Sequence, residues 1–126
     1  MFSHVMIGTN DLEKSKTFYD AVFGAIGVEP GFVDSGRRVF WRTKTGTFCV
    51  TKPIDGEPAT CANGGTIGFA VDTPEQAHAW HDAGIANGGT SIENPPGVRK
   101  GPTMELYLAY LRDPDGNKVC AMMRMG

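Results

Sequence analysis

The sequence predicts an α+β domain made of two tandem β-α-β-β-β modules, with a largely antiparallel sheet that carries its helices on one face. The main observation is an internal repeat at an offset of 62 residues. Residues 4–21 read HVMIGTNDLEKSKTFYDA, and residues 66–83 read TIGFAVDTPEQAHAWHDA. Each copy passes from the alternating apolar pattern of a strand to the spacing of a helix. Self-similarity of this kind indicates a duplicated structural unit.

The first module opens with a strand at residues 2–9, in which Val5 and Ile7 share one face and His4 lies on the other. Asn10 is the expected N-cap of the next helix, because a short polar side chain there can accept a hydrogen bond from the first turn. Apolar residues then recur at helical spacing as far as residue 26. Three further strands are expected at residues 31–34, 38–43 and 47–52.

The second module follows a connector at residues 53–65, which is rich in Pro, Gly, Asp and Asn. Its strand begins at Thr66, and Thr73 followed by Pro74 is a strong helix start. A Pro- and Gly-rich segment at residues 94–102 is either a lid over a site or a plain connector. The remaining strands are expected at residues 91–93, 105–112 and 118–124. Residues 1–126 thus form a single domain, with modules at about 1–52 and 66–126.

Composition excludes several classes of function. The 12 basic and 14 acidic residues give a net charge of −2 without long runs of one sign, so neither nucleic acid nor an anionic membrane is an expected partner. The three cysteines are widely spaced, which favours a reducing cytoplasm over a disulfide framework. No basic start precedes a long apolar run, so no secretory signal is expected. No apolar stretch approaches the roughly 20 residues that span a bilayer.

The repeat and four local motifs resemble the vicinal oxygen chelate superfamily, which includes glyoxalase I, bleomycin-resistance proteins and extradiol dioxygenases. The motifs are HVMI at residues 4–7, the first helix at 12–19, FAV at 69–71 and DPDGNK at 113–118. The resemblance covers essentially the whole chain. It implies that the sheet curves into a cup, with the helices on the outer face and the binding site inside.

The resemblance also implies four metal-ligand positions, one on each of four strands. The first, usually His, corresponds to His4, and the second, often Glu, aligns near Cys49. The third, usually His, corresponds to Thr66, and the fourth, usually Glu, to Cys120. Only His4 keeps the usual chemistry, so this chain is expected to lack most of the usual ligands. A hard divalent ion prefers imidazole and carboxylate groups, and is therefore not expected.

Strand alternation places these four positions on the face that turns away from the helices. On that face we expect ligand-binding contacts from residues of both modules: Met6, Cys49, Thr66, Gly68, Tyr107 and Met122. Tyr107 and Tyr110 lie on opposite faces of one strand, so one of them is expected to reach the cup. Such a lining is mostly apolar with a few polar groups, as in most small-molecule sites.

The preferred hypothesis is therefore a cytoplasmic protein that binds a small organic molecule in the cup without a metal or other cofactor, and that forms a homodimer as related proteins do. If it catalyses a reaction, His4 is the candidate general base and Cys120 the candidate nucleophile. The alternative is a lactoylglutathione lyase-like or dioxygenase-like enzyme with a rebuilt site. In that case His4, Cys49 and Cys120 would form a Cys2His set, which suits zinc.

Overall fold

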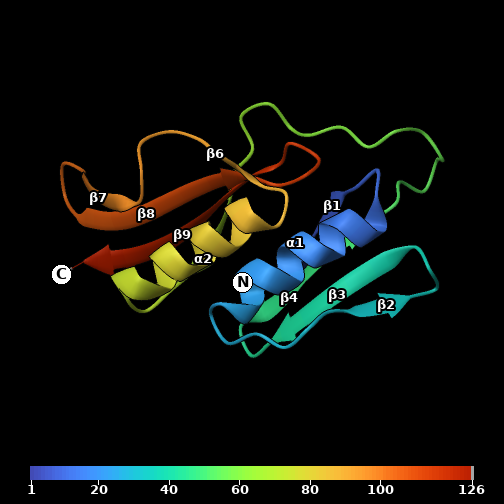
Figure 1. The fold of residues 1–126 in the computed structure, drawn as a ribbon, viewed down its shortest axis with the longest axis horizontal. Helices are drawn as coiled ribbons and strands as arrows, with labels where there is room; N and C mark the ends of the chain where they lie inside the picture. Colours follow the sequence, from blue (N-terminus) through green and yellow to red (C-terminus); the bar gives the residue numbers. More distant parts are fainter. Residues whose placement is uncertain (126) are drawn as a thin grey trace.

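The computed structural model describes residues 1–125 and arranges them as two modules side by side (Figure 1). The first module contains β1 (His4–Gly8), α1 (Leu12–Gly24), β2 (Phe32–Asp34), β3 (Arg38–Thr43) and β4 (Gly46–Thr51). The second contains β5 (Ile67–Ala70), α2 (Pro74–Ala86), β6 (Thr90–Ser91), β7 (Gly97–Lys100), β8 (Glu105–Arg112) and β9 (Lys118–Met125). The predicted α+β fold with one helix per module is confirmed.

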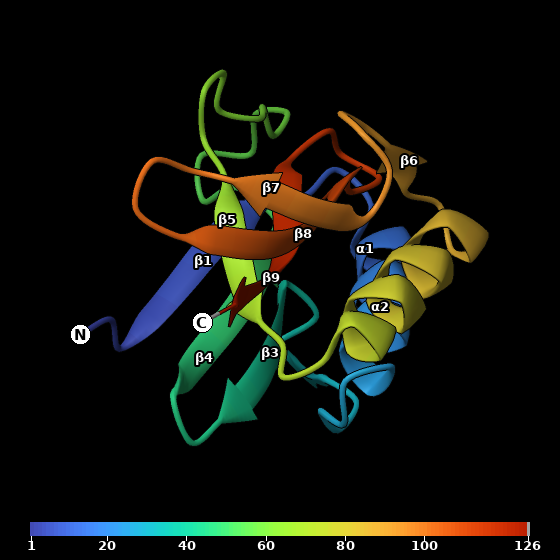
Figure 2. The ribbon, with the colours of Figure 1, turned by 90° about the vertical axis from the view of Figure 1, so that its left-hand side faces the viewer.

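The strands form two open, mixed sheets, one from each module. The order in the first sheet is β1-β4-β3-β2, and in the second it is β5-β9-β8-β6, with β7 also paired to β8. In each sheet the first strand of the module runs parallel to the last, and the other pairs are antiparallel. Helices α1 and α2 lie next to each other on one side of both sheets (Figure 2). We call the opposite side of each sheet its cup face.

The helices begin at polar caps, although one cap differs from the expected residue. Thr73 caps α2 by accepting a hydrogen bond from the Gln76 amide, as predicted. In α1 the N-cap is Asp11 instead of Asn10. The Asn10 side chain binds the backbone of Ala59 in the connector at 2.7 and 3.1 Å, so a tertiary contact takes it away from the helix. Within residues 1–125, no helix is long and apolar enough to cross a membrane.

The core lies between the helices and the sheets. The apolar strand positions that alternation predicted to face the helices are part of it or pack against it: Val5, Ile7, Phe48, Val50, Ile67, Phe69, Val71, Val119, Ala121 and Met123. Phe23 of α1, Phe48 of β4 and Phe69 of β5 meet at one end, with ring centroids 4.9 Å apart for Phe23 and Phe69 and 5.2 Å apart for Phe48 and Phe69. This aromatic cluster joins the first module to the second.

A buried polar contact joins the modules at another point. Asp113, which begins the turn between β8 and β9, is 4% exposed and accepts a 2.7 Å hydrogen bond from the Tyr19 hydroxyl of α1. In the same turn, Asp115 accepts hydrogen bonds from the Thr9 hydroxyl at 2.6 Å and the Asn10 amide at 2.8 Å. The DPDGN sequence thus serves as a connection between modules as well as a turn.

The segment at residues 94–102 is neither a free lid nor a plain connector. Residues 97–100 form β7, which pairs with β8 through four successive partners. The preceding residues form a bulge between β6 and β7, in which Glu93 has a φ of 59°. The Arg99 guanidinium donates to the carbonyls of Asn94, Pro95 and Gly97, at 2.8 to 3.2 Å. These bonds tie the bulge to the sheet.

Candidate functional site

Three rows of side chains make up the cup face of the first sheet. Across the strands they read His4, Thr47 and Arg42; then Met6, Cys49, Phe40 and Phe32; then Gly8, Thr51, Arg38 and Asp34. The middle row is apolar, and its ends are open to solvent, with Met6 38% and Phe32 45% exposed. The two outer rows are polar and each carries a guanidinium group. The face is thus an apolar stripe between two polar borders.

The cup face of the second sheet places a tyrosine beside a buried cysteine. Gly68, Cys120 and Tyr110 are successive cross-strand neighbours on it, and Met122 lies beside Ala70 in the next row. The Lys118 ammonium lies 4.7 Å from the centre of the Tyr110 ring and forms an ion pair with Glu93. Beside the arginines Arg112 and Arg124, this face therefore presents the Tyr110 phenol, the Cys120 thiol and Lys118, whose ammonium already has a carboxylate partner.

Tyr107 does not lie on the cup face, and its expected contact with a ligand there is wrong. Its hydroxyl forms a 2.6 Å hydrogen bond with the ring of His78 on α2, which places it on the helix side of β8. Tyr110, three residues on along the strand, lies on the cup face instead. Strand alternation predicts that only one of these two tyrosines reaches the cup, but it does not say which one.

The four implied metal-ligand positions are divided between the sheets. His4 and Cys49 lie on β1 and β4 of the first sheet, and Cys120 lies on β9 of the second. Thr66 is exposed and precedes β5 by one residue. Among residues 1–125, no three His, Cys, Asp or Glu side chains lie close enough to hold a metal ion. Within one chain, His4, Cys49 and Cys120 therefore do not come together in one cluster.

The two cup-face cysteines are buried, and this changes their chemistry. Cys49 is fully buried, and burial raises the pKa of its thiol in spite of the opposing effects of Arg42 and Arg38. Cys120 is 5% exposed, and burial raises the pKa of its thiol to about 11. At neutral pH both groups are thiols, and a thiol is a poor nucleophile. The expected role of Cys120 as a nucleophile is therefore not supported.

His4 remains accessible. Its side chain is exposed, and its Nδ1 lies 2.9 Å from the Ser3 hydroxyl. Among residues 1–125, Nε2 has no hydrogen-bond partner. A neighbouring hydroxyl that holds one ring nitrogen orients the imidazole and leaves the other free for a ligand. Of the two candidate catalytic residues, His4 is the one that a bound molecule can reach.

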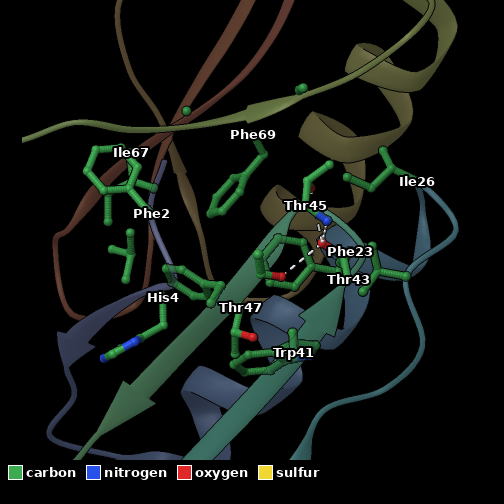
Figure 3. Close-up of a pocket in the computed structure, with 16 residues that line it drawn as sticks. Phe2, His4, Phe23, Ile26, Trp41, Thr43, Thr45, Thr47, Ile67 and Phe69 are labelled. Carbon is green, nitrogen blue, oxygen red and sulfur yellow. Dashed lines mark hydrogen bonds between the residues drawn. The ribbon is translucent and has the colours of Figure 1, made fainter.

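The main pocket lies at the seam between the modules, where β1 and the β3–β4 hairpin face β5. Its volume is about 460 Å³. Its apolar lining comes from both modules: Phe2, Val5, Phe23, Ile26, Val28, Trp41, Phe48, Ile67, Phe69 and Ala70. Polar groups come from His4 and from the hydroxyls of Thr43, Thr45 and Thr47. Figure 3 shows Phe69 projecting from β5 into the pocket, whereas the His4 ring stands at the edge of the pocket and points away from Phe69. We call this cavity the seam pocket.

The seam pocket overlaps only in part with the predicted site. Of the predicted residues, His4 and Gly68 line it, whereas Met6, Cys49, Cys120 and Met122 lie elsewhere on the cup faces. Half of its apolar lining comes from strand positions that face the helices, and sequence alternation assigns such positions to the core. The one available signal was the repeat itself, because two modules with separate sheets must meet along a seam.

Comparison with known proteins places the chain in a family. The family model "Glyoxalase/Bleomycin resistance protein/Dioxygenase superfamily" matches residues 1–121. A crystal structure of a glyoxalase/bleomycin resistance protein from Albidiferax ferrireducens T118 is 60% identical, covering 96% of this chain and 97% of that one, with a TM-score of 0.93. No curated protein matches the chain.

More distant solved structures share the fold. A glyoxalase/bleomycin resistance protein/dioxygenase family enzyme from Burkholderia phytofirmans PsJN is 23% identical, with a TM-score of 0.71 and 95% of each chain covered. A lactoylglutathione lyase from Agrobacterium tumefaciens is 22% identical, with a TM-score of 0.66 and coverage of 97% of this chain and 92% of that one. The duplicated module, the paired mixed sheets and these matches agree. The chain belongs to the glyoxalase/bleomycin resistance protein/dioxygenase superfamily.

Proposed function

We propose that this protein binds a small organic molecule at the seam pocket and the adjoining cup face, without a divalent metal. The observation that carries the proposal is the seam pocket, whose volume of about 460 Å³ is in the range of ligand sites. Its floor is aromatic, and its polar groups are neutral hydroxyls together with one imidazole. Such a lining favours a ligand with a flat apolar body and a few hydrogen-bonding groups.

The chemistry of the four ligand positions supports the metal-free part of the proposal. A hard cation gains little from Cys49 and Cys120, because both are buried thiols that would have to lose a proton first. If the protein catalyses a reaction on its ligand, His4 is the side chain suited to act as general base. The alternative is a lyase or dioxygenase in which a metal is held by His4, Cys49 and Cys120.

A homodimer and a cytoplasmic location belong to the same proposal. The cup face of the first sheet leaves Met6 and Phe32 partly exposed, and a second copy could cover it with its own second module. Pairing of this kind would bring His4 and Cys49 of one copy opposite Cys120 of the other. The three cysteines are unpaired, which suits a reducing compartment.

Two measurements test the proposal. In the first, aromatic fragments are screened by thermal shift against the wild type, Thr47→Phe and Thr90→Phe. Thr47 lines the seam pocket, and phenylalanine there fills its mouth; Thr90 is an exposed residue of β6 outside the pocket. We expect fragments to raise the Tm of the wild type and of Thr90→Phe, but not of Thr47→Phe. Equal responses in all three proteins would contradict the proposed site.

The second measurement concerns the metal. We expect the purified protein to hold no stoichiometric metal by elemental analysis, and zinc, nickel and manganese to leave its Tm unchanged. Stoichiometric metal that is lost in His4→Ala would favour the metal-dependent alternative. Sedimentation of the same samples tests the dimer, which predicts a species of twice the chain mass.

A further inference from the structure

The cup face of the first sheet carries an ordered group of arginines and aromatic rings. Phe32 and Phe40 are stacked, with centroids 5.3 Å apart and an angle of 22° between their planes. The Arg42 guanidinium lies 4.7 Å from the centre of the Phe32 ring and 5.8 Å from that of Phe40. The Arg38 guanidinium lies 5.8 Å from the Phe40 ring on the other side of the row. Both cations are thus held against aromatic rings, at a cation–π distance.

The two arginines differ in their charge partners. Arg38 donates to Asp34 at 2.6 Å, although its Nε is buried and has no acceptor among residues 1–125. Arg42 forms no ion pair among the residues that the structure describes. Asp34 is the one carboxylate in the three rows, so the face carries an excess positive charge on a protein whose net charge is −2. A cation in that setting attracts an anionic ligand.

The spacing of the rows suggests how such a ligand would lie. Successive strands are about 4.8 Å apart, so the apolar row from Met6 through Cys49 and Phe40 to Phe32 is roughly 14 Å long. Arg42 is two residues from Phe40 along β3, roughly 7 Å away, and it borders this row. A flat ring system can therefore pack on Met6 and Phe40 over the buried Cys49, with an acidic group at Arg42.

We propose that the ligand of this protein is a flat organic monoanion, such as an aromatic carboxylate, whose acidic group binds Arg42 and whose apolar body packs on the Met6–Cys49–Phe40 row. This proposal rests on the proposed function and specifies its ligand class. The guanidinium fork can hold a carboxylate through two hydrogen bonds. The row adjoins the seam pocket without lining it: Arg42 is the cross-strand neighbour of Thr47, which lines the pocket.

Arg38 and Arg42 also disfavour a divalent metal ion at Cys49. Arg42 and Arg38 lie close enough to Cys49 to lower the pKa of its thiol, although burial outweighs them. Two guanidinium groups beside this position repel a divalent cation and attract an anion. The position at which the family often has a carboxylate is here surrounded by positive charge and holds a group that is neutral at neutral pH.

Two probes of the same shape test the charge preference: 2-naphthoate and the neutral 2-naphthamide. Their affinities are measured by calorimetry on the wild type, Arg42→Gln and Arg37→Gln. Arg37 is an exposed arginine of the β2–β3 turn, so its substitution removes the same charge away from the row. We expect the wild type and Arg37→Gln to bind 2-naphthoate at least tenfold more tightly than the amide. In Arg42→Gln the two affinities should agree within about twofold.

The outcomes separate this proposal from the proposed function. Binding of both probes with equal affinity by the wild type would overturn the anion preference and leave small-molecule binding intact. A lack of binding by either probe at millimolar concentration would count against both. If Arg37→Gln and Arg42→Gln weakened the binding of 2-naphthoate equally, the preference would be a general effect of net charge. That result would also overturn the role of Arg42. As a second readout, 2-naphthoate should shift the NMR signal of the methyl group that disappears in Met6→Leu, and an unshifted signal would refute the proposed position.

Discussion

Replacement of Tyr19 by phenylalanine should weaken the contact between the two modules without opening the core. The Tyr19 ring is fully buried and packs near Phe18, Phe23, Trp41 and Phe48, with centroids 4.7 to 5.6 Å away. Phenylalanine keeps that packing and removes only the hydroxyl. The lost interaction is the 2.7 Å hydrogen bond to Asp113, which lies 94 positions away in the sequence.

The expected loss follows from the surroundings of Asp113. A hydrogen bond to a charged group is worth about 1.5–3 kcal/mol. The carboxylate keeps its bonds from the amides of Asp115 and Asn117 and from the Asn117 side chain. The free energy of unfolding should therefore fall by about 2 kcal/mol, which lowers the Tm by about 6–9 °C for a domain of this size. Burial, followed by Asp113, raises the pKa of Tyr19 well above its usual range, so this difference should be constant from neutral pH up to about pH 9.

Urea unfolding followed by circular dichroism measures this loss, and Tyr107→Phe is the matched control. The Tyr107 hydroxyl also forms a short hydrogen bond, but its partner, His78, is exposed, so water can replace it. The control should change the free energy of unfolding by less than about 0.5 kcal/mol. A loss in Tyr19→Phe no larger than in the control would refute the idea that the buried Tyr19–Asp113 bond joins the modules.

Two further predictions concern the helix interface and the buried thiols. A Cβ at Gly84 of α2 would lie 2.2 Å from Leu111, so Gly84→Ala should lower the free energy of unfolding by about 1–3 kcal/mol. A Cβ at Gly24 meets nothing within 4 Å, so the control Gly24→Ala should change it by less than about 1 kcal/mol. Similar losses in the two variants would contradict close packing at Gly84. The pKa of Cys120 is raised to about 11, so its contribution to stability is fully present below pH 9 and is lost as the pH rises toward 11. Between pH 8 and pH 10.5 the wild type should lose about 2 kcal/mol more than Cys120→Ala in urea unfolding, and parallel pH profiles would show that this thiol is not buried in solution.

Much of the fold could be predicted because each module combines two clear periodicities. Val5 and Ile7 alternate with His4, and Thr73 followed by Pro74 marks a helix start, so local residues decide these elements. Asn10 does not cap α1 as local preference predicts, because its side chain binds the backbone of Ala59, which lies 49 positions away. Sequence preference identified a cap at this helix start, but a tertiary contact decided which of two adjacent polar residues supplies it.

The site was harder to predict, for two physical reasons. Alternation divides a strand into two faces but says nothing of how two sheets meet, so the seam pocket between helix-facing residues such as Phe48 and Phe69 could not be foreseen. Strand β7 is not predicted because its four residues directly follow a Pro-rich bulge, and only the antiparallel pairing with β8 defines it. The prolines interrupt the alternating pattern by which a strand is recognised in the sequence.

The residue at position 49 affects both metal binding and ligand binding at the cup face. A carboxylate at position 49 would lie one strand from the row positions of Arg38 and Arg42 and could neutralise their charge. A buried thiol there leaves Arg42 without a carboxylate partner, and it extends the apolar row between Met6 and Phe40. The cysteine that the family resemblance places at a metal-ligand position would thus favour an organic anion at this face. Because both effects have one cause, metal binding and anion binding at this face are expected to exclude each other.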